Sequence, residues 1–236
     1  MKEFFICFGV ILSYTGFAQT QSLNQLVYEI RDPQTGPARF RQALESIGEY
    51  LALQVLDQLE TREMTVKTLT GVVATHQLPT ETAALVTILR AGLPLNTGVQ
   101  RVFSNAEVGF LAMSRDEETL KAKVDYISLP DLRGRCVILS DTTLATGGSI
   151  LDALGIIGQQ QPKQIFVLAA IASQPGIDRV MGRYPQVKIL SAAIDPSLNH
   201  KGYILPGLGD AGDRCFGPKF CTKAELARKC PSPALD

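Results

Sequence analysis

The sequence predicts one α/β domain built on an open, mostly parallel β-sheet with helices on its faces. Three observations predict it: apolar runs of strand length, helical stretches with one apolar face between them, and glycine-containing turns at the junctions. The runs at 136–139 and 165–172 are continuous rather than alternating, which is typical of strands buried on both faces of a parallel sheet. The chain has 236 residues, a length that fits a single large domain. Strands that alternate with helices imply right-handed crossovers.

The N-terminal segment carries an apolar run over residues 4–12 that has two interpretations. With Lys2 before it and Gly16-Phe17-Ala18 after it, the run is similar to a secretory signal. Glu3 cancels the single positive charge, which departs from the pattern of such a signal. The alternative is a first strand at 10–13. The run is too short to span a membrane, which takes about 20 apolar residues. We expect residues 1–20 to be an extension or a first strand, 21–217 to form the domain, and 218–236 to be a surface tail.

The first half of the domain predicts helix, strand, helix and two further strands. Apolar residues from Phe40 to Leu59 recur every three or four positions and indicate one long helix. The run over 85–89 indicates a strand that turns at Arg90-Ala91-Gly92. The elements expected next are a helix over 93–103, a strand over 108–113, a charged surface loop over 114–123 and an edge strand over 126–129.

The second half continues the alternation. The expected elements are a buried strand over 136–139, a helix over 150–157 after a Gly-Gly turn, a strand over 165–172, a helix over 177–184 and a strand over 188–194. In such sheets ligands bind beyond the carboxyl ends of the strands, so the site residues are expected there.

Composition excludes several classes of function. Lys plus Arg and Asp plus Glu both number 23, so no overall positive charge would attract nucleic acid or an anionic membrane. The chain has 5 Cys and 2 His, without a Cys-x-x-Cys pair, which argues against a disulfide framework and a zinc site. We expect a cytoplasmic protein with neither a nucleic-acid nor a membrane partner, and with no metal held by its own side chains.

The strand at 136–139 runs into a segment, residues 140–149, that has the properties of a phosphate-binding turn. Its two adjacent glycines let backbone N–H groups point inward, and the start of the next helix adds partial positive charge. The hydroxyls of Thr146 and Ser149 can donate further hydrogen bonds. Asp141 cannot favour phosphate itself and is expected to accept hydrogen bonds from sugar hydroxyls, which together predicts a ribose 5-phosphate. The alternative is an ordinary strand-to-helix turn in which Asp or Thr caps the helix.

Residues 207–212 satisfy the G-x-G-x-x-G pattern of dinucleotide-binding folds. Pro206 precedes the first glycine, we expect no periodic helix after Gly212, and no further βαβ unit follows, so we exclude NAD. A glycine-rich loop led by proline instead exposes backbone N–H and C=O groups that can pair with a flat pyrimidine edge. The alternative is a plain connecting loop.

Four segments, in chain order, resemble the uracil phosphoribosyltransferase family, a branch of the type I phosphoribosyltransferases. Residues 141–149 are similar to its loop for phosphoribosyl pyrophosphate (PRPP), in the Leu-Ala-Thr-Gly-Gly-Ser form. Residues 203–214 are similar to its uracil-binding signature, residues 88–93 to its pyrophosphate-side loop, and residues 115–119 to a further block. The resemblance covers residues 23–217 and implies a type I phosphoribosyltransferase-like fold.

The resemblance implies an enzyme of pyrimidine salvage that converts uracil and PRPP to UMP and diphosphate, with Mg²⁺ bound mainly through PRPP. It implies catalytic roles for Asp141, Arg115 and Asp210. The residues that it places around PRPP are Arg90, Arg115, Asp141, Thr142, Thr143, Leu144, Ala145, Thr146, Gly147, Gly148, Ser149 and Asp210. The residues that it places around uracil, largely through main-chain atoms, are Ile204, Gly209, Asp210 and Ala211. Both arginines suit pyrophosphate because a guanidinium can bind its oxygens in a bidentate manner.

One departure from the family leaves alternatives open. Thr142 and Thr143 follow Asp141 where the family has Pro-Met, which removes a proline that would stiffen the turn. The alternatives are a phosphoribosyltransferase for another nucleobase, or a non-catalytic regulator on the same fold that senses nucleotides and binds RNA. The partners that the resemblance implies are the small molecules uracil and PRPP, a GTP effector as in some members, and further copies of the chain in a homo-oligomer.

Overall fold

A six-stranded β-sheet lies at the centre of the structure, a computed structural model that describes residues 20–115 and 122–218. In chain order its strands are β3 (Ala84–Leu89), β4 (Val108–Arg115), β5 (Ala122–Ser128), β6 (Cys136–Leu144), β7 (Gln164–Ser173) and β8 (Lys188–Asp195). They lie in the order β5-β4-β3-β6-β7-β8. Neighbours pair in parallel except β5, which runs antiparallel to β4 at the edge. The prediction of an open, mostly parallel sheet is confirmed.

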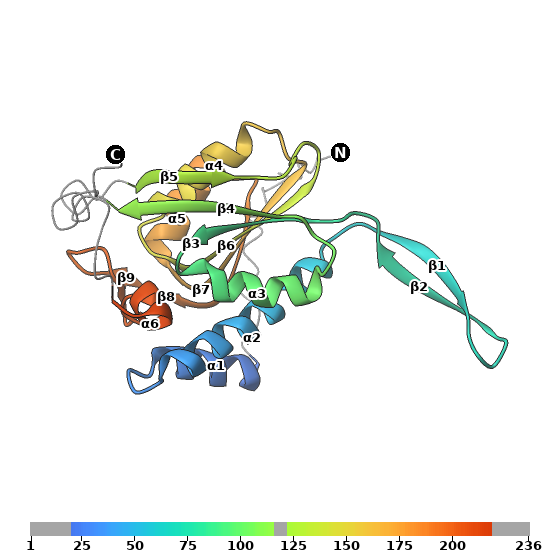
Figure 1. The fold of residues 1–236 in the computed structure, drawn as a ribbon, viewed down its shortest axis with the longest axis horizontal. Coiled ribbons are helices and arrows are strands. Elements are labelled where there is room, and N and C mark those ends of the chain that lie inside the picture. Colours follow the sequence, from blue (N-terminus) through green and yellow to red (C-terminus); the bar gives the residue numbers. More distant parts are fainter. Residues whose placement is uncertain (1–19, 116–121, 219–236) are drawn as a thin grey trace, which may run out of the picture.

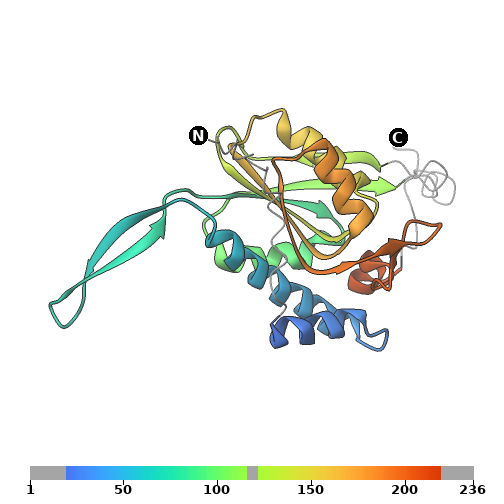
Figure 2. The same ribbon diagram turned by 180° about the vertical axis from the view of Figure 1, so that it is seen from behind.

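Helices cover both faces of this sheet, as Figure 1 and Figure 2 show. The helices α1 (Gln21–Arg31), α2 (Pro37–Leu56) and α3 (Gly92–Val102) pack on one face, and α4 (Gly148–Gly158) and α5 (Gln174–Arg183) on the other. Alternate residues of each central strand serve the two layers: Ile138 packs with α1–α3, whereas Val137 packs with α4 and α5. This two-sided burial is why the central strands are continuously apolar in the sequence.

Several element boundaries differ from the predicted ones. The helix α2 ends at Leu56, so Leu59 lies beyond it, although the side chain of Leu59 is still buried. The predicted charged loop over 114–123 is wrong at both ends, because Ser114 and Arg115 pair with Lys123 and Ala122 and extend β4 and β5. The helix α1 is absent from the sequence predictions.

A two-stranded hairpin, also absent from the predictions, projects away from the body of the molecule (Figure 1). It consists of β1 (Thr61–Lys67) and β2 (Val73–Pro79), which pair antiparallel. All residues of β1 are exposed. Neither face of the hairpin is therefore covered by the part of the chain that the structure describes.

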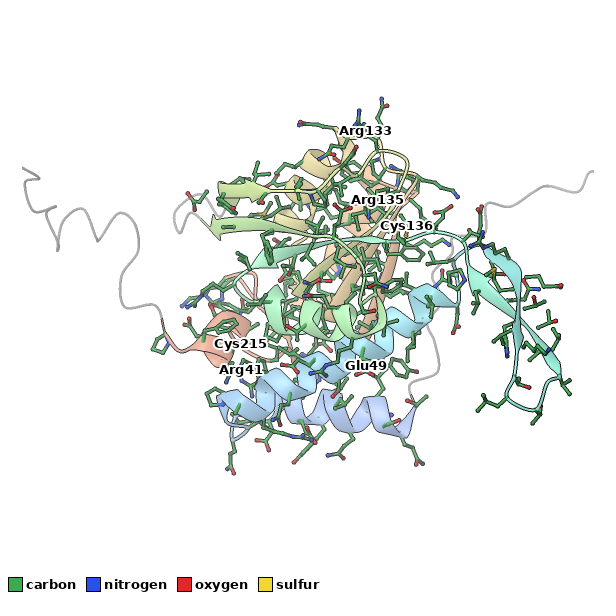
Figure 3. The ribbon with its side chains drawn as sticks, turned by 45° about the vertical axis from the view of Figure 1, so that its right-hand side comes forward. Arg41, Glu49, Arg133, Arg135, Cys136 and Cys215 are labelled. Carbon is green, nitrogen blue, oxygen red and sulfur yellow. The ribbon has the colours of Figure 1, made fainter. Side chains whose placement is uncertain are left out.

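Beyond the sheet, the chain forms a small C-terminal unit. The short strands β9 (Ser197–Leu198) and β10 (Ile204–Leu205) pair antiparallel, and the six-residue helix α6 (Ala211–Phe216) follows. This helix corrects the expectation that no helix follows Gly212. It forms because Asp210 caps its first turn: Oδ1 of Asp210 accepts the backbone N–H of Asp213 at 2.9 Å. Figure 3 shows Arg41 of α2 beside Cys215 of α6, and Nη1 of Arg41 donates to the carbonyl of Cys215 at 2.6 Å.

Two predictions for the chain ends lie outside the described residues: the strand at 10–13 and the tail beyond Pro218. Among residues 20–115 and 122–218, no helix has the length and apolar character needed to cross a bilayer. Cys136, predicted as a core residue, is buried in β6 and carries a free thiol.

Candidate active site

Three chain segments meet at the carboxyl edge of the sheet. They are the turn after β3, the turn after β6, and the glycine-rich segment, which we define as residues 207–213. Oγ1 of Thr142 donates to the carbonyl of Ala91 at 2.6 Å, which joins the first two. Nη2 of Arg90 donates to Oδ1 of Asp213 at 3.0 Å, which joins the first and the third. The structure therefore brings together the predicted phosphate-binding and base-binding segments.

Asp141 lies near the end of β6, with 9% of its surface exposed. Its Oδ1 accepts the backbone N–H of Thr142 at 2.7 Å. Burial raises the pKa of this carboxyl from 3.8 to about 7, and hydrogen bonds from the backbone of Thr142 and Thr143 offset part of that rise. The carboxyl therefore gains its charge near neutral pH, and it accepts hydrogen bonds from hydroxyl groups best once it is ionised.

The end of β6 is longer than predicted. Thr142, Thr143 and Leu144 belong to the strand, so the connection to α4 consists only of residues 145–147, which we call the phosphate turn. The side chains of Thr142 and Leu144 are fully buried, and Leu144 packs into the core beneath α4 and α5. These two residues can contact a ligand only through their backbone. Thr143, Ala145 and Thr146 are partly exposed.

The helix α4 begins at Gly148 without a side-chain cap. Its N-cap residue, Gly147, has φ 77° and ψ −3°, a left-handed conformation that glycine adopts without strain. No acidic residue lies in the first turn, and Ser149 in that turn is partly exposed. The hydroxyl of Thr146 reaches the N–H of Gly148 only at 3.5 Å. The amides of this helix end and its partial positive charge are thus available to an anion.

The two predicted arginines both lie at this edge of the sheet. Arg90 follows β3 directly and is half-exposed, with its guanidinium 3.0 Å from the carboxylate of Asp213. Arg115 is the last residue of β4, which runs parallel to β3, so its backbone lies at the same edge. The side chain of Arg115 is outside the described set.

The predicted base-binding residues divide into buried and exposed ones. The side chains of Ile204 and Ala211 are buried in the core, in the cluster against which Ala91 and Ala145 pack. Gly209 and Asp210 are exposed, and Gly209 has φ 85°. Among the described residues, the backbone N–H groups of both residues and the carbonyl of Gly209 make no hydrogen bond, whereas the carbonyl of Asp210 accepts the N–H of Arg214 at 3.0 Å.

An ion pair that the sequence reasoning missed holds the glycine-rich segment from behind. Asp195, at the end of β8 and 4% exposed, makes two hydrogen bonds with Arg31 of α1, at 2.6 and 2.9 Å. Asp195 also accepts the N–H of Gly207 at 2.9 Å, and Arg31 donates to the carbonyl of the same glycine at 2.9 Å. The signal that could have found Asp195 is an acid at the carboxyl end of a buried strand, as at Asp141.

Arg214 of α6 is a second support that the sequence reasoning missed. It donates to the carbonyl of Leu208 at 3.0 Å and to that of Asp32 at 2.6 Å. Its guanidinium lies 4.2 Å from the centre of the Phe40 ring. Arg214 thereby connects the glycine-rich segment to the α1–α2 layer.

Within residues 20–115 and 122–218, no group of three or more His, Cys, Asp or Glu side chains could hold a metal ion. The described site carries three carboxylates, those of Asp141, Asp210 and Asp213. Asp141 lies on β6, whereas Asp210 and Asp213 belong to the glycine-rich segment, so a divalent ion here would need most of its ligands from a bound substrate.

Comparisons with known proteins agree with this arrangement. The family model described as uracil phosphoribosyltransferase matches residues 17–218. The uracil phosphoribosyltransferase of Dictyoglomus thermophilum is 42% identical over 192 residues, which cover 81% of this chain and 93% of that protein. The uracil phosphoribosyltransferase of Clostridium botulinum is 40% identical over 191 residues, which cover 80% of this chain and 91% of that protein. The solved structure of the AQ2163 protein from Aquifex aeolicus has a TM-score of 0.80 at 35% identity, and it covers 86% of this chain and 98% of that chain.

Proposed function

Because the chain belongs to the uracil phosphoribosyltransferase family, we propose that it transfers the 5-phosphoribosyl group of PRPP to uracil and releases UMP and diphosphate. This reaction serves pyrimidine salvage. The observation that carries the proposal is the meeting of the three segments at one sheet edge, through the Thr142–Ala91 and Arg90–Asp213 hydrogen bonds.

The β6–α4 junction is suited to the ribose 5-phosphate part of PRPP. The uncapped end of α4 would bind the 5-phosphate through backbone N–H groups, with Thr146 and Ser149 as further donors. Asp141 would accept hydrogen bonds from the ribose hydroxyls. Arg90 and Arg115 would bind the diphosphate, because guanidinium groups pair with its oxygens in a bidentate manner.

The glycine-rich segment is suited to uracil. The ring is flat and presents N–H donors and C=O acceptors along one edge, which exposed main-chain groups at Gly209 and Asp210 can match. Ile204 and Ala211 would complete the pocket for the ring. The ion pair of Arg31 with Asp195 would keep the segment rigid, and rigidity lowers the entropic cost of binding.

In the reaction, a bond forms between N1 of uracil and the anomeric carbon of PRPP. The bond from that carbon to the diphosphate oxygen breaks and leaves its electron pair on diphosphate, while the N1 proton passes to solvent. The sugar gains oxocarbenium character on the way, as in other glycosyl transfers. The chain's own contribution is to orient both substrates and to stabilise negative charge on the leaving diphosphate through Arg90 and Arg115.

Mg²⁺ bound mainly through PRPP would neutralise further charge on the diphosphate. Asp141 comes from β6 and Asp210 from the glycine-rich segment, so the ion would take most of its ligands from the substrate. Asp210, which is exposed, is the carboxylate we assign to this complex, directly or through water.

The test is diphosphate release by the full chain with uracil, PRPP and Mg²⁺. Cytosine, hypoxanthine and orotate are run in parallel, because another preferred base would reject uracil as the substrate. Release with none of the four bases would instead favour a non-catalytic role, which equilibrium binding of PRPP then checks.

We also propose that the chain forms a homo-oligomer through the exposed hairpin β1–β2. One face of the hairpin carries Met64, Val66 and Leu78, which are 40–52% exposed, together with Arg62 and His76. A two-stranded hairpin is only marginally stable by itself in water, so a partner that covers these three exposed apolar residues would stabilise it. A second copy of this chain is the partner that we propose, because further copies are present wherever the chain is made.

Sedimentation of the wild type at micromolar concentration tests this proposal. We expect a dimer or larger species, which Val66→Glu should dissociate because it places a charge on the apolar face. The control is Thr65→Glu, on the opposite face of the same strand, which should leave the oligomer intact. A monomeric wild type would end the proposal.

A cytoplasmic location is the last part of the proposal. Cys136 and Cys215 are buried free thiols, the state that a reducing compartment maintains. Fractionation of cells that make the full chain, with the mass of the purified protein, tests it. A processed N-terminus in the secreted fraction would contradict it.

A further inference from the structure

Side chains from α5 hold the carbonyl groups of the phosphate turn. Oγ of Ser173, the N-cap of α5, donates to the carbonyl of Ala145 at 2.6 Å. Nη1 of Arg179, within α5, donates to the carbonyl of Thr146 at 3.0 Å. The two backbones also touch, since a Cβ added to Gly176 would lie 2.1 Å from the carbonyl oxygen of Ala145. The turn after β6 therefore rests on the helix that follows β7.

Because of the geometry of the peptide unit, the hydrogen bonds to these two carbonyl groups also fix the direction of the N–H groups that follow them. A peptide group is planar and trans, so its C=O and the N–H of the next residue point in opposite directions. Fixing the carbonyl of Ala145 toward α5 turns the N–H of Thr146 away from α5. Fixing the carbonyl of Thr146 does the same for the N–H of Gly147. Within the described part of the chain, neither of these N–H groups has a hydrogen-bond acceptor.

We propose that Arg179 is a positioning residue for PRPP: by holding the carbonyl of Thr146, it aims the N–H of Gly147 at the 5-phosphate. This inference rests on the function proposed above and adds to it a residue outside the four family-like segments. Arg179 acts from the far side of the turn and does not itself contact the substrate. Removing it should weaken binding of PRPP without changing the site for uracil.

Arg179 is well suited to a test because the chain offers a matched control. Arg183 lies one turn further along α5, is also exposed, and lines the same surface groove beside Tyr184. Among the described residues Arg183 makes no hydrogen bond or ion pair. Arg179→Met and Arg183→Met remove the same charge from the same helix, but only the first breaks a contact with the phosphate turn.

The experiment measures KM for PRPP, KM for uracil and kcat for the full-length wild type and both variants. For Arg179→Met we expect KM for PRPP to rise about three- to tenfold, which is the value of one hydrogen bond, with KM for uracil within twofold of wild type. Arg183→Met should match the wild type in all three constants. Arg179→Lys, which keeps a donor and the charge, should restore most of the loss.

Two results would overturn the inference. One is equal KM values for PRPP in Arg179→Met and Arg183→Met, because any change in KM would then come from the lost charge and not from the lost hydrogen bond to Thr146. The other is a proportional change in both KM values together with a lower unfolding temperature, which would assign Arg179 a merely structural role. A wild type that releases no diphosphate with uracil would overturn the proposed function instead. The four proteins would then be compared by equilibrium binding of PRPP, where the same ranking is expected.

Discussion

The units β6–α4 and β7–α5 lie side by side in the sheet, run in parallel, and differ in how each strand joins its helix. β7 passes directly into α5, and Ser173 caps the helix by accepting the N–H of Gly176 at 2.9 Å. β6 reaches α4 through the phosphate turn, and no side chain caps α4. In the register of the two strands, Asp141 lies opposite Ala169 and Thr143 lies opposite Ile171. We call β6–α4 the open unit, because α4 has no side-chain cap, and β7–α5 the closed unit, because Ser173 caps α5.

The difference shows how neighbouring units at one sheet edge can have different roles: one keeps its helix amides free for a ligand, and the other stabilises the first. A helix end capped by its own side chain has already used the amides that an anion would need, whereas an uncapped end keeps them. The closed unit then stabilises the open one, because Ser173 both caps α5 and donates to the phosphate turn. On the function proposed above, the polar residues of the open unit would bind PRPP, and the closed unit would hold them in place.

The largest effect is expected when an acid is placed in the first turn of α4, the helix end that lacks a side-chain cap. In Ser149→Asp the carboxylate would occupy the region proposed for the 5-phosphate and repel it. Like charges in contact cost several kcal/mol, so KM for PRPP should rise by more than about 100-fold. The free energy of unfolding should increase by about 0.3–1 kcal/mol, because an acid near a helix N-terminus is favourable. Steady-state kinetics and urea unfolding measure the two effects.

The control for that substitution is Ser22→Asp. Ser22 occupies the equivalent second position of α1, a helix that Thr20 caps. We expect the same small gain in stability with no change in activity. A loss of activity in the control, or normal kinetics in Ser149→Asp, would refute the role of the α4 end.

The next largest effect is expected at Asp141, a carboxylate on β6 that lies opposite Ala169 on β7. Asp141→Asn keeps the shape of the side chain but removes the charge that accepts the ribose hydroxyls. Hydrogen bonds to a charged group are worth about 1.5–3 kcal/mol, so kcat/KM for PRPP should fall about 10- to 100-fold. In the wild type, kcat/KM should rise with pH up to about 7, the pKa of this carboxyl. The variant should not show that rise.

The same substitution should change stability in the opposite direction. Burial raises the pKa of Asp141 from 3.8 to about 7, so between those values the folded state binds more protons than the unfolded state. The free energy of unfolding of the wild type therefore falls as pH rises through this interval. Asp141→Asn should be more stable than the wild type above pH 7, and the advantage should disappear toward pH 4. Equal stability at pH 8 would contradict the assigned pKa.

The contrast between the two units also shows what the sequence could and could not predict. The buried strands and the phosphate turn are local patterns: an apolar run, then an acid, hydroxyls and two glycines. The support at Asp195 depends on Arg31, 164 positions away along the chain, and no local pattern records such a pair. The hairpin β1–β2 was not predicted, because its sequence lacks the continuous apolar run that marks the other strands. It lacks that run because nothing in the described chain buries β1.

A smaller effect is expected from Thr142→Val, which removes the hydrogen bond between the end of β6 and the turn after β3. The substitution nearly keeps the volume of the side chain and leaves the partly buried carbonyl of Ala91 without its donor. The free energy of unfolding should fall by about 1–3 kcal/mol. Thr143→Val is the matched control, because the Thr143 side chain makes no hydrogen bond among the described residues and should cost less than about 0.5 kcal/mol. Urea unfolding of the two variants compares them, and equal losses would show that the Thr142–Ala91 bond does not stabilise the site.

The smallest effect on activity is expected from Ser173→Ala, which removes the side-chain cap of α5. Losing a helix cap costs about 1 kcal/mol, the loss we expect for Thr20→Ala at the start of α1, and Ser173→Ala should lose more because it also removes the donor to the carbonyl of Ala145. Only Ser173 also donates to Ala145, so Ser173→Ala alone should raise KM for PRPP, about two- to fivefold. Ser173→Thr keeps the hydroxyl, so KM for PRPP should stay near the wild-type value, although the added methyl enters a fully buried site and should lower stability. If Thr20→Ala and Ser173→Ala changed KM for PRPP equally, the closed unit would contribute stability to the fold but no order to the phosphate turn.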